Sequence, residues 1–195
     1  MEMKKLIFVL VILIGFLSCE SDIKPKPKAF LSLEYPEAEY KTLKLNMPFT
    51  FESNTLAEDV TIKELNATTE SYGVNVSYPK LKGTIFLTYK SIDNNKEYLT
   101  NFLRDAQNFT QEHTQKADAI VEQPFEDAKR NVYGMFYEIG GNAASQSQFY
   151  VTDSTNHFLI GSLYFYAKPN YDSILPAANY LQKDIKHIME TVKWK

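Results

Sequence analysis

The sequence contains a single cysteine among 195 residues, and this scarcity excludes several kinds of site. A disulfide framework needs pairs of cysteines, and a metal centre built on thiolates needs several of them. Cys19 stands alone, and the three histidines (His113, His157 and His187) are far apart, without the spacing of metal ligands. The sequence therefore predicts no metal site, and it predicts a fold whose stability comes from its hydrophobic core.

The motifs that mark common enzymes and nucleotide-binding proteins are missing too. The chain has no GxSxG elbow, Walker loop, HExxH pair or GxGxxG turn. The stretch "TDSTNH" holds Asp153, Ser154 and His157, but residues this close along one turn rarely reach the geometry of a catalytic triad. The stretch "GGNAASQ" is more typical of a tight hairpin turn than of a phosphate-binding loop. We therefore expect no catalytic residue, no cofactor-binding residue and no enzymatic activity.

Long runs of one charge and long apolar runs are scarce as well. The net charge is −3 and no long basic run appears, which argues against nucleic acid as a partner. The longest apolar run, from Leu6 to Leu17, has 12 residues. A helix needs about 20 to cross a bilayer, so the run does not predict a permanent transmembrane anchor.

What this run does predict is a signal peptide at residues 1–18. Lys4 and Lys5 precede it, and the small residue Ser18 follows it, directly before Cys19. The sequence "FLSC" resembles a bacterial lipobox, in which the cysteine becomes the lipidated first residue of the mature chain. A signal peptide with a chance cysteine is the alternative. We interpret Cys19 as a lipidation site, since acyl chains such as palmitate supply membrane affinity of about 0.8 kcal/mol per buried methylene.

Residues 19–29 are predicted to form a tether. Pro25 and Pro27 alternate with lysines in "KPKPK", which favours an extended path and opposes a helix. The lysines could contact anionic headgroups, but a solvated spacer is the simpler interpretation. The remaining chain, residues 30–195, has a length and an aromatic content that fit one globular domain.

Within this domain, alternating patterns predict a series of β-strands. Short strands are expected at residues 30–33, 49–52 and 60–65, and a hairpin at 74–78 and 85–89. Three further strands follow at residues 132–139, 147–153 and 157–167, separated by short turns at Gly140-Gly141 and "STN". We expect this antiparallel meander to be covered on both faces, because runs such as Leu163 to Tyr166 are apolar on both sides.

Two amphipathic helices complete the predicted fold. The first runs from about Lys96 to Lys116, with apolar residues every three or four positions. The second starts at Asp172-Ser173, has Pro176 near its beginning, and continues to the C-terminus. The fold class is therefore α+β, an antiparallel sheet of about five to seven strands packed with two amphipathic helices. A sandwich of the PsbP/Mog1 type is one candidate.

Several longer stretches carry a family resemblance along nearly the whole mature chain. They include "VNVSYPKLKGTIFLTYK", "VYGMFYEIGGNAASQSQFYVTDSTNHFLIGSLYFYAKPNYDS" and the final "ETVKWK". These resemble the GldD family of gliding motility lipoproteins of the Bacteroidota. The resemblance implies an envelope lipoprotein required for gliding, in a machinery linked to type IX secretion. Other proteins of that machinery would be its partners, and the periplasmic face of the outer membrane its location. The lipidated cysteine is the only functional residue that the resemblance implies for this chain, and it corresponds to Cys19.

The resemblance leaves two hypotheses for the function. The domain is either a structural or assembly component that docks onto other envelope proteins, or a binding module for a small ligand, a lipid or a glycan. A docking protein should show an exposed patch, and a binding module a concave pocket with a few convergent polar groups.

A further hypothesis concerns glycosylation. Bacteroidota glycosylate secreted proteins at short motifs similar to "DST" at Asp153 and "DSI" at Asp172, so Ser154 and Ser173 are candidate sites.

Overall fold

The computed structural model describes residues 34–112, 116–166 and 171–195. The signal peptide, Cys19, the tether at 19–29, the strand expected at 30–33 and His113 lie outside the described residues, so these predictions stay untested by the structure.

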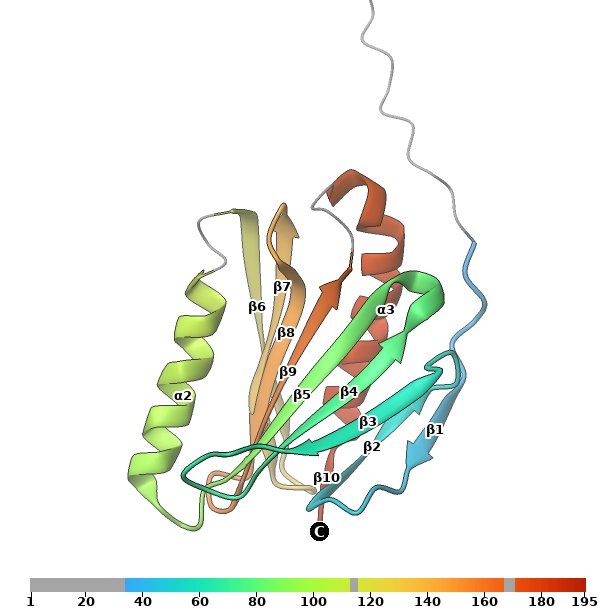
Figure 1. Ribbon diagram of the computed structural model, residues 1–195. Coiled ribbons are helices and arrows are strands. Elements are labelled where there is room, and N and C mark those ends of the chain that lie inside the picture. The colour runs from blue at the N-terminus through green and yellow to red at the C-terminus, as the bar shows by residue number, and fades with distance from the viewer. Residues whose placement is uncertain (1–33, 113–115, 167–170) are drawn as a thin grey trace, which may run out of the picture.

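The larger of two sheets has seven antiparallel strands in the order β3-β4-β5-β9-β8-β7-β6 (Figure 1). Their bounds are β3 (Asp59–Glu64), β4 (Ser71–Tyr78), β5 (Gly83–Ser91), β6 (Ala117–Asp127), β7 (Val132–Gly141), β8 (Ser145–Thr152) and β9 (His157–Phe165). A short 3-10 helix, η1 (Pro79–Leu81), joins β4 to β5. The smaller sheet consists of β1 (Tyr40–Leu43), β2 (Phe49–Asn54) and β10 (Lys193–Trp194), with β2 in the middle.

Two helices pack on opposite faces of the larger sheet (Figure 1). Helix α2 (Lys96–Gln111) begins after Asn95, whose side-chain oxygen accepts a hydrogen bond from the backbone N–H of Glu97 at 2.9 Å. Helix α2 packs on Phe158 and Ile160 of β9, whereas helix α3 (Tyr171–Thr191) shares a core with their neighbour Leu159. Successive side chains of a strand point to opposite faces, so the two helices lie on opposite faces of the sheet. The predicted α+β architecture, an antiparallel sheet packed with two helices, is confirmed.

The main core lies between α3, the smaller sheet and one face of the larger sheet. Leu181, Ile185 and Ile188 of α3 are fully buried, as are Phe49 and Phe51 of β2. The sheet contributes every second residue of its strands to this core: Val74, Val76, Ile85, Leu87, Phe149, Val151, Leu159 and Leu163. This spacing is the alternation that predicted the hairpin and the meander from the sequence.

Several element boundaries differ from the predictions. Helix α2 ends at Gln111, before Lys116, and α3 ends at Thr191, because the last residues pair with β2 as strand β10. Helix α3 starts at Tyr171, which places Pro176 inside the helix and not in its first turn.

Strand β6 was not predicted at all. It is an edge strand that pairs only with β7, and most of its side chains are partly or fully exposed. Its sequence, ADAIVEQPFED, therefore mixes charges with a proline and shows no apolar alternation. Proline is tolerated on an edge strand because its missing N–H can face away from the ladder.

Candidate functional site

One half of the larger sheet is left open on the side where α2 packs. We call the following side chains the open face: Asn75, Ser77, Phe86, Thr88, Tyr164 and Tyr166. Register pairs Asn75 with Phe86 and Ser77 with Thr84, and β5 pairs with β9 on its other side. Their sequence neighbours on the opposite face of β4 and β5, such as Val76 and Leu87, are fully buried, whereas the residues of the open face are half-buried or exposed. Figure 1 shows α2 lying to one side, away from β3 and β4.

Aromatic rings stand at the centre of the open face. The rings of Phe86 and Tyr164 meet edge to face with centroids 5.7 Å apart. Tyr166 is 70% exposed, and its hydroxyl oxygen accepts a hydrogen bond from Thr84 Oγ1 at 3.0 Å. The expectation that the meander is covered on both faces is therefore confirmed for Phe158 and Leu159 but wrong for Tyr166, because α2 does not extend over this end of β9.

A buried carboxylate connects α3 to the smaller sheet. Asp184 is only 1% exposed. The Asn54 side-chain amide donates to its Oδ1 and Oδ2 at 3.1 and 2.9 Å, and the Tyr40 hydroxyl donates to Oδ1 at 2.9 Å. Burial raises the pKa of the Asp184 carboxyl, and these hydrogen bonds act in the opposite direction. The carboxylate is occupied by structural donors, which fits an anchoring role for α3.

His187 continues this contact between α3 and the smaller sheet. Its ring stacks on Tyr40 with centroids 3.6 Å apart, and its Nε2 lies 2.9 Å from Glu52 Oε2. Thr191, one turn further along α3, accepts a hydrogen bond from the backbone N–H of Glu52 at 3.0 Å. The His187 ring is therefore held by stacking on Tyr40 and by a polar contact with Glu52.

The three residues of "TDSTNH" do not form a triad. The Asp153 carboxylate accepts hydrogen bonds from the backbone N–H groups of Thr155, Asn156 and His157 at 2.8 to 2.9 Å, which closes the β8–β9 turn. The His157 ring lies 2.8 Å from the Tyr89 hydroxyl through Nδ1 and stacks on Trp194. Ser154 is exposed at the tip of the turn. The predicted hairpin at "GGNAASQ" is confirmed, since β7 ends at Gly141 and β8 starts at Ser145.

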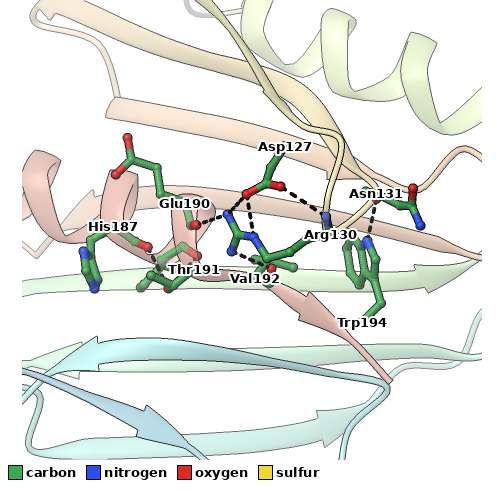
Figure 2. Close-up of polar contacts among 9 residues, drawn as sticks. Asp127, Arg130, Asn131, His187, Glu190, Thr191, Val192 and Trp194 are labelled. Carbon is green, nitrogen blue, oxygen red and sulfur yellow. Dashed lines mark hydrogen bonds and ion pairs between the residues drawn. The ribbon is translucent and has the colours of Figure 1, made fainter.

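The turn between β6 and β7 holds the C-terminal end of α3, a contact that we call the Arg130 clasp (Figure 2). Arg130 donates from Nη1 to the carbonyl oxygen of Val192 at 3.0 Å, and from Nη2 to that of Glu190 at 2.5 Å. Its Nε donates to Asp127 Oδ2 at 2.7 Å, and this guanidinium holds the pKa of the Asp127 carboxyl below its ordinary value. The Trp194 indole N–H donates to the carbonyl oxygen of Asn131 at 3.0 Å.

Sequence reasoning did not find the Arg130 clasp. An arginine near the end of a helix is a recognisable capping signal only when the two are close in sequence, and here 62 residues separate Arg130 from Val192.

Neither a metal centre nor a membrane helix appears in the described parts of the chain. Across residues 34–112, 116–166 and 171–195, no group of three His, Cys, Asp or Glu side chains could hold a metal ion. Over the same ranges, none of the helices combines the length and apolar character that a bilayer crossing requires.

Comparison with known protein families gives a match along most of the chain. The model of the family described as gliding motility lipoprotein GldD matches residues 20–194. No curated protein and no solved structure matches the chain, so the PsbP/Mog1-type sandwich stays a prediction. The family match covers the described residues as far as Trp194, and the chain belongs to the GldD family of gliding motility lipoproteins.

Proposed function

We propose that this protein is a non-enzymatic assembly component of the gliding machinery, held to the envelope by lipid and docked onto a partner protein of the same machinery. Membership of the GldD family implies the role in gliding and the lipid attachment. The observation that carries the docking role is the open face, an uncovered half-sheet with aromatic rings at its centre.

The composition of the open face suits a protein partner. Phe86, Tyr164 and Tyr166 offer large rings with few rotatable bonds. The neighbouring open-face residues of β4 and β5 are Asn, Ser and Thr, and the charged Asp59 and Lys63 lie further out, on the edge strand β3. Protein interfaces are enriched in tyrosine and depleted of charge at their centres. A partner that covers the rings would bury apolar area and leave the polar side chains to hydrogen-bond at the rim.

The absence of catalysis is supported by how the polar groups of the described domain are used. Asp184 is saturated by Asn54 and Tyr40, and the rings of His157 and His187 each have a stacked neighbour and a polar partner. A general base needs a ring nitrogen or carboxylate oxygen within reach of a substrate proton. These groups instead connect elements of the fold.

The proposal includes the attachment and the location of the domain. After removal of residues 1–18, Cys19 carries acyl chains such as palmitate, residues 19–29 act as a spacer, and residues 30–195 form one domain. The periplasmic face of the outer membrane, next to the type IX secretion proteins of a Bacteroidota cell, is the proposed site. The length of the spacer would let the domain turn its open face toward a partner beside the membrane.

Affinity purification from the native envelope, with quantitative mass spectrometry, tests this function. Wild type is compared with Cys19→Ala and Tyr166→Ser, and Ile62→Ser is the matched control because Ile62 is an exposed apolar residue (43%) on β3, outside the open face. Gliding or secretion proteins should co-purify with wild type and Ile62→Ser, and fall several-fold with Tyr166→Ser. Loss of membrane association in Cys19→Ala would confirm the anchor.

Two results would contradict the proposal. Equal recovery of partners with Tyr166→Ser and Ile62→Ser would exclude the open face as the docking surface. Recovery of no envelope protein above background with wild type would exclude the assembly role itself.

A further inference from the structure

A groove runs along the other face of the larger sheet, between the first half of α3 and the strands β6, β7 and β8. We call it the lateral groove, and its volume is about 240 Å³. Small side chains leave this space open: Ala119, Gly140, Ser147 and Ala178 lie on its walls. The remaining lining residues are Val121, Glu138, Ile139, Gln146, Leu175, Asn179 and Gln182.

A β-bulge shapes the floor of the lateral groove. Ser145 pairs with Tyr164 and Ser147 pairs with Leu163, so two steps along β8 match one step along β9. Gln146 is the extra residue of this bulge. A bulge breaks the strict alternation of side chains, and the consecutive residues Gln146 and Ser147 both line the groove. Bulges commonly re-aim side chains in this way next to binding sites.

Two polar atoms of these residues have no partner within the described structure. Gln146 is 6% exposed; its Nε2 donates to the carbonyl oxygen of Ala143 at 2.8 Å, but its Oε1 accepts no hydrogen bond. Ser147 is fully buried and its Oγ also lacks a partner. Buried polar groups are nearly always hydrogen-bonded, because an unmade bond is costly. Two such groups side by side on a groove wall therefore indicate a ligand that completes their bonds.

The chemistry of the lining restricts the class of ligand. Among the described residues that line the lateral groove there is no Lys, Arg or His to act as counter-charge for an anion, and Glu138 is the one charged residue. Lys186, the nearby cation, donates to Gln123 Oε1 at 2.8 Å, and Gln123 Nε2 donates to Glu138 Oε1 at 2.6 Å. Gln146 Oε1 needs a donor, and the Ser147 hydroxyl needs an acceptor or a donor. A hydroxyl group satisfies both.

We propose that the lateral groove binds a neutral, hydroxyl-rich small molecule of about the size of one sugar unit. The side chains of Gln146, Ser147 and Glu138 would accept and donate hydrogen bonds on the sheet side, and Asn179 and Gln182 on the helix side. Leu175 and Val121 supply apolar contacts for the C–H face of such a ring. This site is separate from the open face, and it does not depend on the docking role proposed above.

The sugar could be a free molecule or the terminal unit of an envelope glycan, which share this chemistry. A panel of glucose, galactose, mannose and N-acetylglucosamine, each as the free sugar and as its methyl glycoside, separates the two sources. The full-length, isotope-labelled lipoprotein in detergent micelles is titrated with each compound to high millimolar concentration, and the side-chain amide resonances of Gln146, Asn179 and Gln182 are followed by NMR. A glycan end should be mimicked by the methyl glycoside, whereas a site for free sugar should prefer the free form.

Two variants and a matched control make the test specific. Ser147→Ala removes the unpartnered hydroxyl, so it should weaken binding by about tenfold or more while the Tm stays equal or rises. Asn179→Trp places a large side chain at an exposed position of the groove wall and should abolish the amide shifts. Lys183→Ala is the control: Lys183 is exposed on α3 next to Gln182 and is not among the residues that line the groove, so its loss should leave both the Tm and binding unchanged.

The proposal is wrong if no sugar of the panel shifts the groove amides of the wild type. It is also wrong if the shifts persist in both Ser147→Ala and Asn179→Trp, because binding would then occur elsewhere. Neither result would affect the docking role, whose test reads co-purified proteins and uses Tyr166.

Discussion

Arg130 Nη1 donates a hydrogen bond to the carbonyl oxygen of Val192 at 3.0 Å, which joins the β6–β7 turn to the residues just after α3. A helix leaves its last carbonyl groups without partners inside the helix. The Arg130 guanidinium meets two carbonyl oxygens at this end and the Asp127 carboxylate at the same time. This contact joins the C-terminal end of α3 to the β6–β7 turn of the larger sheet.

Replacing Arg130 should therefore destabilise the domain. We expect Arg130→Ala to lower the free energy of unfolding by about 2 kcal/mol, because several charge-assisted hydrogen bonds are lost together. Arg130→Lys should recover little of this loss, since one ammonium does not reproduce the planar fork. Urea unfolding of both variants measures the effect, with Lys129→Ala, an exposed neighbour, as the control. Equal stability of Arg130→Ala and Lys129→Ala would show that the clasp contributes nothing.

Asp184 should make stability depend on pH. Burial raises its folded-state pKa above the unfolded value, so the folded protein binds the proton more tightly than the unfolded chain. Its contribution to stability is therefore greatest below the unfolded pKa and is lost as pH rises through the raised folded pKa. The stability of Asp184→Asn relative to wild type should improve over that interval. Chemical unfolding at a series of pH values checks the sign, with Glu190→Gln on the same helix as the exposed control. If the difference in free energy of unfolding between Asp184→Asn and wild type did not change with pH, this assignment would be wrong.

Gly134 should tolerate no side chain. A Cβ at this position of β7 would lie 1.9 Å from the Tyr150 carbonyl oxygen of the neighbouring strand. We expect Gly134→Ala to cost about 3 kcal/mol or more, because the backbone of β8 would have to move. Gly73→Ala in β4 is the matched control: the nearest atom to its Cβ would be Leu65 Cδ2 at 3.6 Å, an ordinary contact, so stability should stay within about 1 kcal/mol of wild type. Thermal unfolding of both variants distinguishes them, and similar Tm values would show that β7 and β8 can separate locally.

Ser154 and Ser173 are both accessible for glycosylation, since each side chain is exposed, one in the β8–β9 turn and one near the start of α3. The intact mass of the protein purified from its native cell should exceed that of the lipidated chain. The excess should be reduced by Ser154→Ala or Ser173→Ala and disappear in the double variant. An unmodified mass for the wild type would rule out both sites.

The elements that could be predicted from the sequence are those with one fully buried face. Val74 and Val76 alternate with Asn75 and Ser77 because one side of β4 meets the core and the other does not. The apolar residues of α3 recur every three or four positions for the same reason, because one side of the helix meets the core and the other does not. Strand β6 lacks such a contrast, and strand β10 is only two residues long, so their pairing partners, and not their own residues, make them strands.

The candidate sites could be predicted less well than the fold. Tyr164 and Tyr166 look like core residues in the sequence, and whether a helix covers them depends on where α2 crosses the sheet. The unpartnered Gln146 and Ser147 are recognisable only once the bulge and the wall of α3 are seen together.

The sequence by itself determined the α+β class, the family resemblance and most strands, because apolar period and turn residues act over short distances along the chain. Only the tertiary structure decided which half-sheet is open, where the lateral groove lies and how Arg130 reaches Val192. These features join residues that are far apart in sequence, and their contacts arise from packing between elements, which no local pattern encodes.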